Sequence, residues 1–320
     1  MKFLLIRYSS LGDVVLTTSV ARSIREASPE ARVYVLTKDI YTDVFSENPD
    51  ITGVFTRPVL RMKFDFVIDL HNSLRSNLVK YVVPAKQRLT YNKAAAARRV
   101  FLHSGLMQNS LEKTVIQRYL EPVSRAGLDV RLSKPVITIT PGEQERAERL
   151  TGKTPYIALA PGAKWLTKEW FEDKYTALII KTIRETGLNT VLIGDKSDEK
   201  LASSIKMGTG VLRSHVVNLA GKTGIRDLAA VIKNAKVLIT PDTAALHIGW
   251  AVSTPVVSLF GPTVKEFGFQ PVDKNVVIIE KDLDCRPCSL HGSEKCRYKD
   301  RACMQRIEAY EVLNEARKFL

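Results

Sequence analysis

Two residues near the start of the chain, Gly12 and Asp13, are of types that could bind a phosphate group or accept a proton. They follow the apolar residues 2–7, and the sequence after them predicts a helix. A glycine there lets the backbone approach a phosphate, and the helix offers its first amides to an anion. The Asp13 carboxylate is a candidate general base or, alternatively, the N-cap of the helix. The segment is not a GxGxxG motif, which disfavours a nicotinamide oxidoreductase.

A second candidate segment, residues 160–170, reads APGAKWLTKEW. Gly162 follows a predicted strand, and Lys164, Thr167 and Lys168 come directly after it. Lysine ammonium groups beside free backbone amides suit the negative charge of a diphosphate. The alternative interpretation is a solvated loop that a tryptophan anchors.

A third segment places Asp242 and Thr243 between a predicted strand and a predicted helix, with His247 one turn further on. Three polar groups at one helix start suit the binding of hydroxyl or phosphate groups. The alternative is that Asp242 caps the helix and His247 is a buried core residue. The run PVVSLFGPT follows at residues 255–263.

Alternating strands and helices must position these segments. In the first half, short apolar runs predict strands at residues 2–7, 32–36 and 66–70, and a helix at residues 14–27. In the second half, the predicted strands are residues 156–160, 190–193, 237–240 and 255–259. This alternation indicates parallel α/β sheets, which bind ligands at the carboxyl ends of their strands.

The pattern restarts after a junction at residues 136–155, so we expect two α/β halves with a cleft between them. The expected boundaries are residues 1–152 and 153–320, with the last helix a candidate to pack back on the first domain. No apolar run approaches the ~18–20 residues that a membrane span requires. The first eight residues, with Arg7 among them, are too short for a secretory signal, so we expect an intracellular protein.

The formal charge of +14 is concentrated in residues 51–100. The basic residues there are Arg57, Arg61, Lys63, Arg75, Lys80, Lys86, Arg88, Lys93, Arg98 and Arg99, against only Asp65 and Asp69. They are either solvated surface charges or a surface for phosphate groups on nucleic acid, nucleotide or an anionic lipid. The sequence lacks the aromatic and zinc-finger motifs of nucleic-acid-binding proteins, so we expect no nucleic-acid partner.

All four cysteines of the chain, Cys285, Cys288, Cys296 and Cys303, lie within one short segment. Four thiolates could hold a structural zinc ion, although the spacing fits no standard zinc finger. The alternatives are reduced, partly buried thiols, an iron–sulfur cluster or regulatory disulfides. No acidic cluster suggests a divalent metal in catalysis, and no cofactor is expected to be required.

Several of these motifs resemble glycosyltransferase family 9, the bacterial ADP-heptose:lipopolysaccharide heptosyltransferases. The similar motifs are SSLGDVVLT at residues 9–17, FDFVIDL at 64–70, PGA with Lys168-Glu169-Trp170, the segment from Asp242 to His247, and TPVVSLFGPT at 254–263. Further similar positions are Tyr91-Asn92-Lys93, Arg98-Arg99 and Tyr119-Leu120. The resemblance covers nearly the whole chain in the same order.

The resemblance implies a GT-B type glycosyltransferase, with two Rossmann-like domains that face an interdomain cleft. Such an enzyme would invert the anomeric centre and transfer heptose from ADP-L-glycero-D-manno-heptose to the Kdo–lipid A inner core or to heptosylated core. The first domain would hold the acceptor and the second the ADP-sugar. Asp13 matches the catalytic base, and Lys168 matches the lysine at the donor diphosphate. Asp198 falls near the ribose-binding carboxylate, and residues 221–223 fall where adenine is held.

The full set of donor-binding candidates is Gly12, Gly162, Lys164, Thr167, Asp198, Thr223, Asp242, Thr243 and His247. The acceptor-binding candidates are Arg61, Arg75, Lys93, Arg98 and Arg99. With a lipid-linked acceptor, we expect a cytoplasmic protein at the anionic face of the inner membrane. A leaving ADP gains charge that Lys168 can stabilise, and Asp13 can take the acceptor proton if its site raises its pKa.

Two positions depart from the family pattern. Ala244 stands where the family usually has glycine, and Ala163-Lys164 stand where some members have hydroxyl residues. The alternative function is therefore transfer of another nucleotide-activated sugar to a cell-surface glycan.

Overall fold

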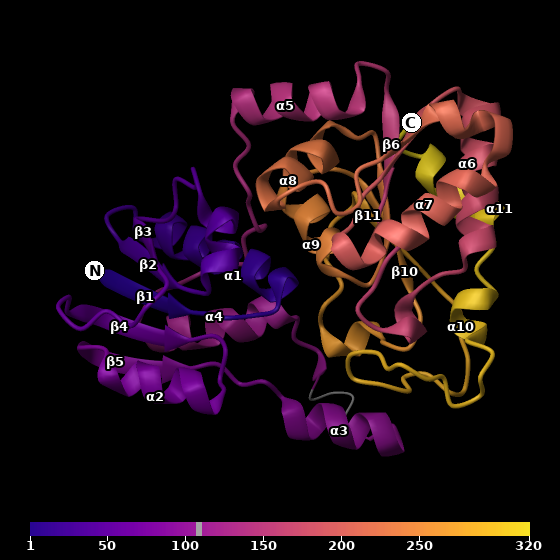
Figure 1. The fold of residues 1–320 in the computed structure, drawn as a ribbon. Helices are drawn as coiled ribbons and strands as arrows, with labels where there is room; N and C mark the ends of the chain where they lie inside the picture. Colours follow the sequence, from indigo (N-terminus) through magenta and orange to yellow (C-terminus); the bar gives the residue numbers. More distant parts are fainter. Residues whose placement is uncertain (107–110) are drawn as a thin grey trace. The chain divides into compact units, whose positions relative to one another are not determined.

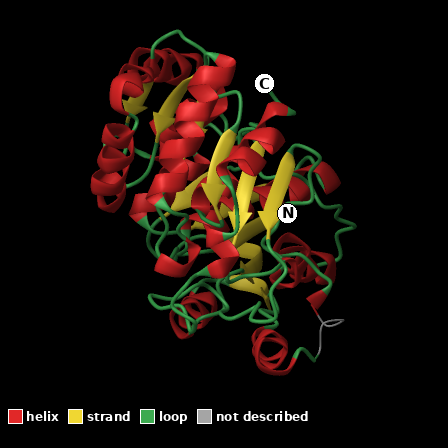
Figure 2. Cartoon of the chain, turned by 90° about the vertical axis from the view of Figure 1, so that its right-hand side faces the viewer, coloured by secondary structure: helices red, strands yellow, loops and turns green. Residues whose placement is uncertain are grey.

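The computed structural model describes residues 1–106 and 111–320, in which the chain forms two compact units. Unit 1 comprises Met1–Thr138 and Glu266–Phe269, and unit 2 comprises Ile139–Lys265 and Gln270–Leu320. Each unit is built on a sheet of parallel strands with helices around it (Figure 2). The expected α/β class is therefore confirmed.

The sheet of unit 1 has the strand order β3-β2-β1-β4-β5, with β1 at its centre (Figure 1). Its strands are β1 (Lys2–Ile6), β2 (Arg32–Leu36), β3 (Gly53–Phe55), β4 (Phe64–Asp69) and β5 (Ala85–Thr90). Its helices are α1 (Leu11–Ala27), α2 (Leu74–Val82), α3 (Ala95–Ser104) and α4 (Val115–Arg125). The sequence predicted β1, β2 and most of β4, but not β3 or β5.

Strand β1 is buried on both faces, as is usual for the central strand of a parallel sheet. Its side chains alternate between the faces, and all of them from Phe3 to Ile6 are fully buried. Leu4 and Ile6 belong to a core cluster against which Val79 of α2 packs. Ile6 is in register with Asp69 of β4, so both strands end at the same edge of the sheet.

The strand order of unit 1 reverses between β1 and β4, because the chain passes from β1 through β2 to β3 and then returns to β4 on the other side. Open α/β sheets bind ligands at the carboxyl ends of the strands beside such a reversal. The fold of unit 1 therefore favours a site formed by residues that follow Ile6 and Asp69.

The sheet of unit 2 has the strand order β11-β10-β9-β6-β7-β8. Its strands are β6 (Tyr156–Leu159), β7 (Asn189–Leu192), β8 (Val216–Asn218), β9 (Leu238–Pro241), β10 (Val256–Phe260) and β11 (Val276–Glu280). Its helices are α5 (Pro141–Thr151), α6 (Glu172–Thr186), α7 (Glu199–Gly208), α8 (Ile225–Asn234), α9 (Ala244–Ala251), α10 (Ala302–Gln305) and α11 (Ala309–Arg317). The sequence predicted β6, β7, β9 and β10, but not β8 or β11.

The strand order of unit 2 reverses between β6 and β9, and Leu159 is in register with Ile239 there. The loops that follow these two strands carry Gly162 on one side and Asp242 on the other. The second and third segments singled out in the sequence therefore leave neighbouring strands at the same sheet edge.

Helices α5 and α11, near the two ends of unit 2, both pack on other elements of that unit. Helix α5 packs on α8, and Arg226 donates two hydrogen bonds to the Glu143 carboxylate at 2.8 and 2.6 Å. The last helix, α11, packs on α6 and β10. In the part of the chain that the structure describes, no helix has the length and apolar character needed to cross a bilayer.

Candidate active site

The candidate base of unit 1, Asp13, lies in the first turn of α1. Ser10 occupies the N-cap position and Asp13 the third helical position. The Ser10 amide and hydroxyl both donate hydrogen bonds to Asp13 Oδ2, at 3.3 and 2.9 Å. The alternative that Asp13 is the N-cap is therefore wrong, and the helix begins at Leu11, three residues earlier than predicted. Gly12 is buried in the same turn.

Asp13 has two further partners to which the sequence analysis assigned no role at this site. Arg7, the first residue after β1, places Nη2 at 2.5 Å from Asp13 Oδ2. Tyr119 of α4 donates its hydroxyl to Asp13 Oδ1 at 3.0 Å. Both members of the ion pair are nearly buried, with side-chain exposures of 8% for Arg7 and 14% for Asp13. The carboxylate is thus held rigidly from two sides.

These contacts determine the charge state of Asp13. Burial alone would raise its pKa, but the Arg7 charge and the hydrogen bonds from Ser10 and Tyr119 together lower the pKa below its ordinary value. The expectation that the site raises the Asp13 pKa is therefore wrong. Asp13 is an ionised carboxylate at neutral pH, which is the form that can accept a proton.

Basic side chains lie around this carboxylate. The pKa of Lys93 is lowered overall, because the effects of burial and of the Arg7 charge outweigh the opposite effects of Asp69 and Asp13. The pKa of His71 is lowered mainly by burial and then by Arg7 and Lys93, which keeps the imidazole neutral at pH 7. Arg98 interacts with Asp13 electrostatically and also donates to the Phe267 carbonyl at 2.7 Å.

The remaining acceptor candidates occupy other parts of unit 1. Arg75 of α2 stacks on the Tyr8 ring, with its guanidinium 4.9 Å from the ring centre. Arg61 is exposed in the segment before β4, and Arg99 is exposed on α3. Of the five acceptor candidates, the structure brings Lys93 and Arg98 into the electrostatic surroundings of Asp13.

An open groove of about 1030 Å³ lies at the end of β5 and along α4. Its lining includes the polar residues Asn72, Thr90, Tyr91, Asn92, Gln117 and Glu121. Tyr91 also packs edge-on against Tyr119, the partner of Asp13. Amides, hydroxyls and an aromatic ring are groups that can hold a sugar.

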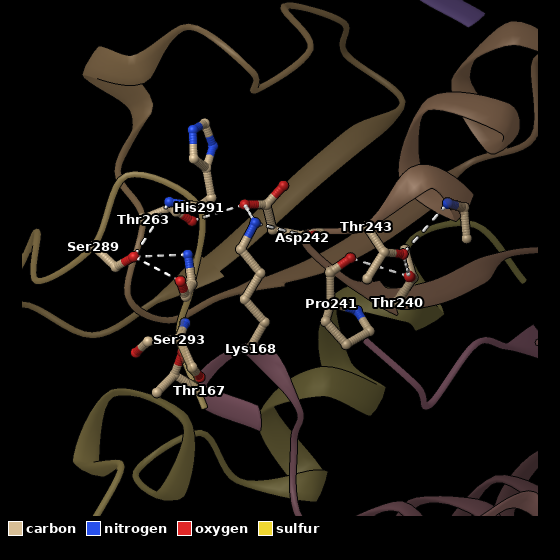
Figure 3. Close-up of polar contacts among 12 residues, drawn as sticks. Thr167, Lys168, Thr240, Pro241, Asp242, Thr243, Thr263, Ser289, His291 and Ser293 are labelled. Atoms are coloured by element: carbon tan, nitrogen blue, oxygen red, sulfur yellow. Dashed lines mark hydrogen bonds and ion pairs between the residues drawn. The ribbon is translucent and has the colours of Figure 1, made fainter. Parts of the chain in front are cut away.

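The candidate site of unit 2 centres on Lys168 and Asp242 (Figure 3). Lys168 Nζ lies 2.5 Å from Asp242 Oδ2 and 3.2 Å from the Asp242 carbonyl oxygen. Thr263, in the loop after β10, donates its hydroxyl to the same Oδ2 at 2.8 Å. The three loops after β6, β9 and β10 therefore meet at one carboxylate.

Helix α9 begins beside this ion pair. Its N-cap is Thr243, whose hydroxyl accepts from the Ala245 amide at 3.3 Å and lies 3.0 Å from the Thr240 hydroxyl. The alternative that Asp242 caps the helix is therefore wrong. His247 is buried one turn further on. The positive end of α9 lies next to Lys168, an arrangement that suits a phosphate group.

Gly162 and Asp198 are directly opposed across the loops after β6 and β7. A methyl group at Gly162 would overlap with the Asp198 carboxylate, so the glycine makes room for it. Burial raises the pKa of Asp198. The Gly221 amide donates to the Gly194 carbonyl at 3.1 Å, which holds the loop before Thr223 beside the β7 loop. The buried Thr223 hydroxyl has no hydrogen-bond partner in the described residues.

Two donor candidates have other contacts. The Thr167 hydroxyl donates to the Ser293 carbonyl at 3.0 Å and accepts from the Ser293 amide at 2.8 Å, so it ties the cysteine-bearing segment to the β6 loop (Figure 3). Lys164 is exposed, with its ammonium 5.0 Å from the Trp165 ring centre. These contacts agree with the alternative of a tryptophan-anchored loop for this part of the segment.

The four cysteines are free thiols, with Cys288 exposed and Cys303 buried. Burial raises the pKa of Cys303 to about 11, so its thiol stays protonated at neutral pH. In the described residues, no group of three or more His, Cys, Asp and Glu side chains is arranged to hold a metal ion. Burial, together with the neighbouring Cys285 and Cys296, also raises the pKa of Cys288, so these thiols lie close to one another.

Unit 1 presents an ionised carboxylate at the reversal point of its sheet, and unit 2 presents a lysine and a helix start at the equivalent point. Two Rossmann-like units with these features define a glycosyltransferase of the GT-B type. The sequence profile of glycosyltransferase family 9 (heptosyltransferase) matches residues 54–299. The chain belongs to glycosyltransferase family 9, as the sequence motifs indicated.

Known relatives cover nearly the whole chain. It is 26% identical over 316 residues to a lipooligosaccharide heptosyltransferase 2 of Haemophilus influenzae, covering 88% of this chain and 90% of the relative. It is also 26% identical over 293 residues to a lipopolysaccharide heptosyltransferase 3 of Escherichia coli, covering 83% of this chain and 85% of the relative. The solved structure of E. coli ADP-heptose lps heptosyltransferase II has the same fold, with a TM-score of 0.80 and 22% identity. The match covers 100% of this chain and 98% of that chain.

Proposed function

We propose that this enzyme transfers heptose from ADP-L-glycero-D-manno-heptose to the inner core of lipopolysaccharide, either Kdo–lipid A or heptosylated core. The observation that carries the proposal is the carboxylate of Asp13, kept ionised by Arg7 and Tyr119 in a chain that belongs to the heptosyltransferase family. The names of the relatives, which refer to lipopolysaccharide, lipooligosaccharide and ADP-heptose, support the proposed acceptor and donor.

The proposed reaction is a single displacement. The oxygen of an acceptor hydroxyl attacks the anomeric carbon, the bond from that carbon to the ADP oxygen breaks, and the configuration inverts. Asp13 accepts the hydroxyl proton as the new bond forms, so no protein nucleophile is needed. Because its pKa is low, Asp13 is a weak base that takes the proton late, when the hydroxyl has become acidic.

The leaving ADP gains negative charge, and in this proposal Lys168 and the first amides of α9 stabilise that charge. Lys168 pairs with Asp242 at 2.5 Å, so a donor diphosphate would compete with this carboxylate for the lysine. Asp198, beside Gly162, would bind the ribose, and the loop with Thr223 the adenine. Thr243 and His247 would lie near the sugar and phosphates.

In this proposal, unit 1 binds the acceptor, with Lys93 and Arg98 beside Asp13, and unit 2 binds the donor. The groove at Tyr91 would hold the acceptor saccharide. The acceptor carries phosphate groups and acyl chains, so the enzyme would work at the anionic inner face of the membrane. Ala244 and Lys164 stand where the family pattern differs, so the second candidate is transfer of another nucleotide-activated sugar to a cell-surface glycan.

Ligand-dependent protection against thermal unfolding tests the choice of donor. ADP-heptose is expected to raise the unfolding temperature, because a ligand that binds only the folded state stabilises it. Other sugar nucleotides should leave the temperature nearly unchanged. Equal or greater protection by a different sugar nucleotide would favour the second candidate.

A further inference from the structure

Helix α2 of unit 1 exposes apolar side chains along one face. Their exposed fractions are 82% for Leu74, 63% for Leu78, 69% for Tyr81 and 60% for Val82. The spacing of four, seven and eight residues from Leu74 places all four on one side of the helix. A contiguous apolar stripe that faces solvent is typical of a surface that binds a partner or a membrane.

The opposite side of α2 is anchored by polar contacts. Ser73 caps the helix, and the Ser76 hydroxyl donates to Asp69 at 2.9 Å. Lys80 is buried, and its ammonium donates to Asn77 at 2.8 Å and to Thr90 at 2.5 Å. Because these contacts already fix the helix, the apolar stripe is not needed to hold α2 on unit 1.

The segment at residues 56–63 lies on the same face of the sheet. Val59 and Met62 pack against the core cluster of Leu4 and Ile6, as does Val79 of α2. Leu60 of this segment is exposed, which adds a further apolar side chain to the outer surface. We call this surface the α2 face; its apolar members are Leu60, Leu74, Leu78, Tyr81 and Val82.

Cationic side chains accompany the α2 face. The exposed cationic residues of the segment 56–63, of α2 and of β5 are Arg57, Arg61, Lys63, Arg75 and Lys86. Both acidic residues of the region are already engaged: Asp65 pairs with Lys86 at 2.7 Å, and buried Asp69 accepts hydrogen bonds from His71, Asn72 and Ser76. The α2 face is therefore apolar and net positive.

We propose that the α2 face docks on the surface of an anionic lipid bilayer. The leucines, the valine and Tyr81 would enter the boundary between headgroups and acyl chains, while the cations contact the phosphates. A helix lying in the interface fits these observations, since no helix in the described residues can span the bilayer. The inference rests on the proposed function in one respect: a lipid-linked acceptor gives the enzyme a reason to bind the membrane.

The test uses the full chain and lipid vesicles without acceptor or donor. Co-sedimentation with phosphatidylcholine vesicles that contain phosphatidylglycerol is expected, with weaker binding to pure phosphatidylcholine and in high salt. The variant L74Q/L78Q keeps residues that favour helices and should bind the anionic vesicles about tenfold or more weakly. The matched control M207Q/V211Q changes apolar residues of unit 2 that are 62% and 93% exposed and should bind like the unchanged protein.

Equal vesicle binding by L74Q/L78Q and the unchanged protein would overturn the proposal. If the unchanged protein forms a dimer, its loss in L74Q/L78Q without a change in vesicle binding would also overturn the proposal, because a second copy of the chain would then cover the face. Heptose transfer to a deacylated, soluble acceptor should be the same for L74Q/L78Q and the unchanged protein. Vesicle binding without any transfer activity would contradict the proposed function and leave the docking surface standing.

Discussion

Arg7 and Asp13 form a nearly buried ion pair, with Arg7 Nη2 at 2.5 Å from Asp13 Oδ2. Arg7 directly follows β1 and Asp13 lies in the first turn of α1, so the pair fixes the connection between the strand and the helix. The pair lowers the Asp13 pKa in the folded state relative to the unfolded state. Its contribution to stability is therefore complete above the unfolded pKa of about 4 and is lost as the pH falls through the lower, folded value.

The hydroxyl of Tyr119 contributes to this low pKa, which predicts the effect of Tyr119→Phe. Loss of the 3.0 Å hydrogen bond should raise the Asp13 pKa, because the bond stabilises the charged form. As the proposed base, Asp13 can accept a proton only when it is ionised, so the acidic limb of the pH profile of kcat/KM should move to higher pH. The phenylalanine keeps the ring that packs on Tyr91. A fall in activity with no shift of the limb would show that Tyr119 acts on folding alone.

Lys168 is predicted to act on the leaving group. Lys168→Met should lower kcat by about 10²–10³, the range measured when one preorganised charge-stabilising group is removed. Lys164→Met is the comparison, since Lys164 is exposed and its ammonium lies over the Trp165 ring. Steady-state kinetics with donor and acceptor varied separately provide the measurement. A larger loss of kcat in Lys164→Met than in Lys168→Met would reverse the assignment of the two lysines.

The close approach of Gly162 and Asp198 predicts a donor-binding defect in Gly162→Ala. The added methyl group would displace the Asp198 carboxylate, so KM for the sugar nucleotide should rise while the acceptor KM changes little. Gly142→Ala is the matched control, because a methyl group there meets no atom within 4 Å. The idea that Asp198 contacts the donor would fail if Gly162→Ala bound ADP as tightly as the unchanged protein.

The cysteine segment is predicted to hold reduced thiols rather than zinc. Elemental analysis of protein purified without added metal should find far less than one zinc ion per chain. Alkylation under native conditions should modify exposed Cys288 before Cys303, since Cys303 is buried and its pKa is raised to about 11. One equivalent of zinc that stays bound through dialysis would contradict this prediction.

The sequence was sufficient to predict the central strands, because β1, β6 and β10 are apolar runs buried on both faces. Strand β5 was not predicted, since its sequence AKQRLT at one edge of the sheet has no apolar pattern. Strands β3 and β8 each have only three residues, too few for a periodic signal. Strand β11 is a plain apolar run, VVIIE, and its sequence does carry the signal that the prediction overlooked.

The candidate site could be predicted only in part. Asp13, Lys168 and Asp242 stand in recognisable motifs, but the partners that set their geometry are distant in sequence. Tyr119 is 106 residues from Asp13, and only the packing of α4 on α1 brings them together. The pKa of Asp13 could not be given the correct direction without these partners. A charged Arg7 at the end of an apolar strand was the one local sign of a buried ion pair.

The most direct test of the proposed function is a transfer assay with ADP-heptose and inner-core acceptors truncated at successive sugars, run with the unchanged enzyme and Asp13→Asn. Thermal unfolding with and without ADP-heptose checks that the variant is folded and binds donor. The unchanged enzyme should add one heptose to one of the acceptors, and Asp13→Asn should bind donor normally but turn over about 10²–10⁴ times more slowly. Near-normal turnover in Asp13→Asn, or no transfer by the unchanged enzyme to any of the acceptors, would contradict the account.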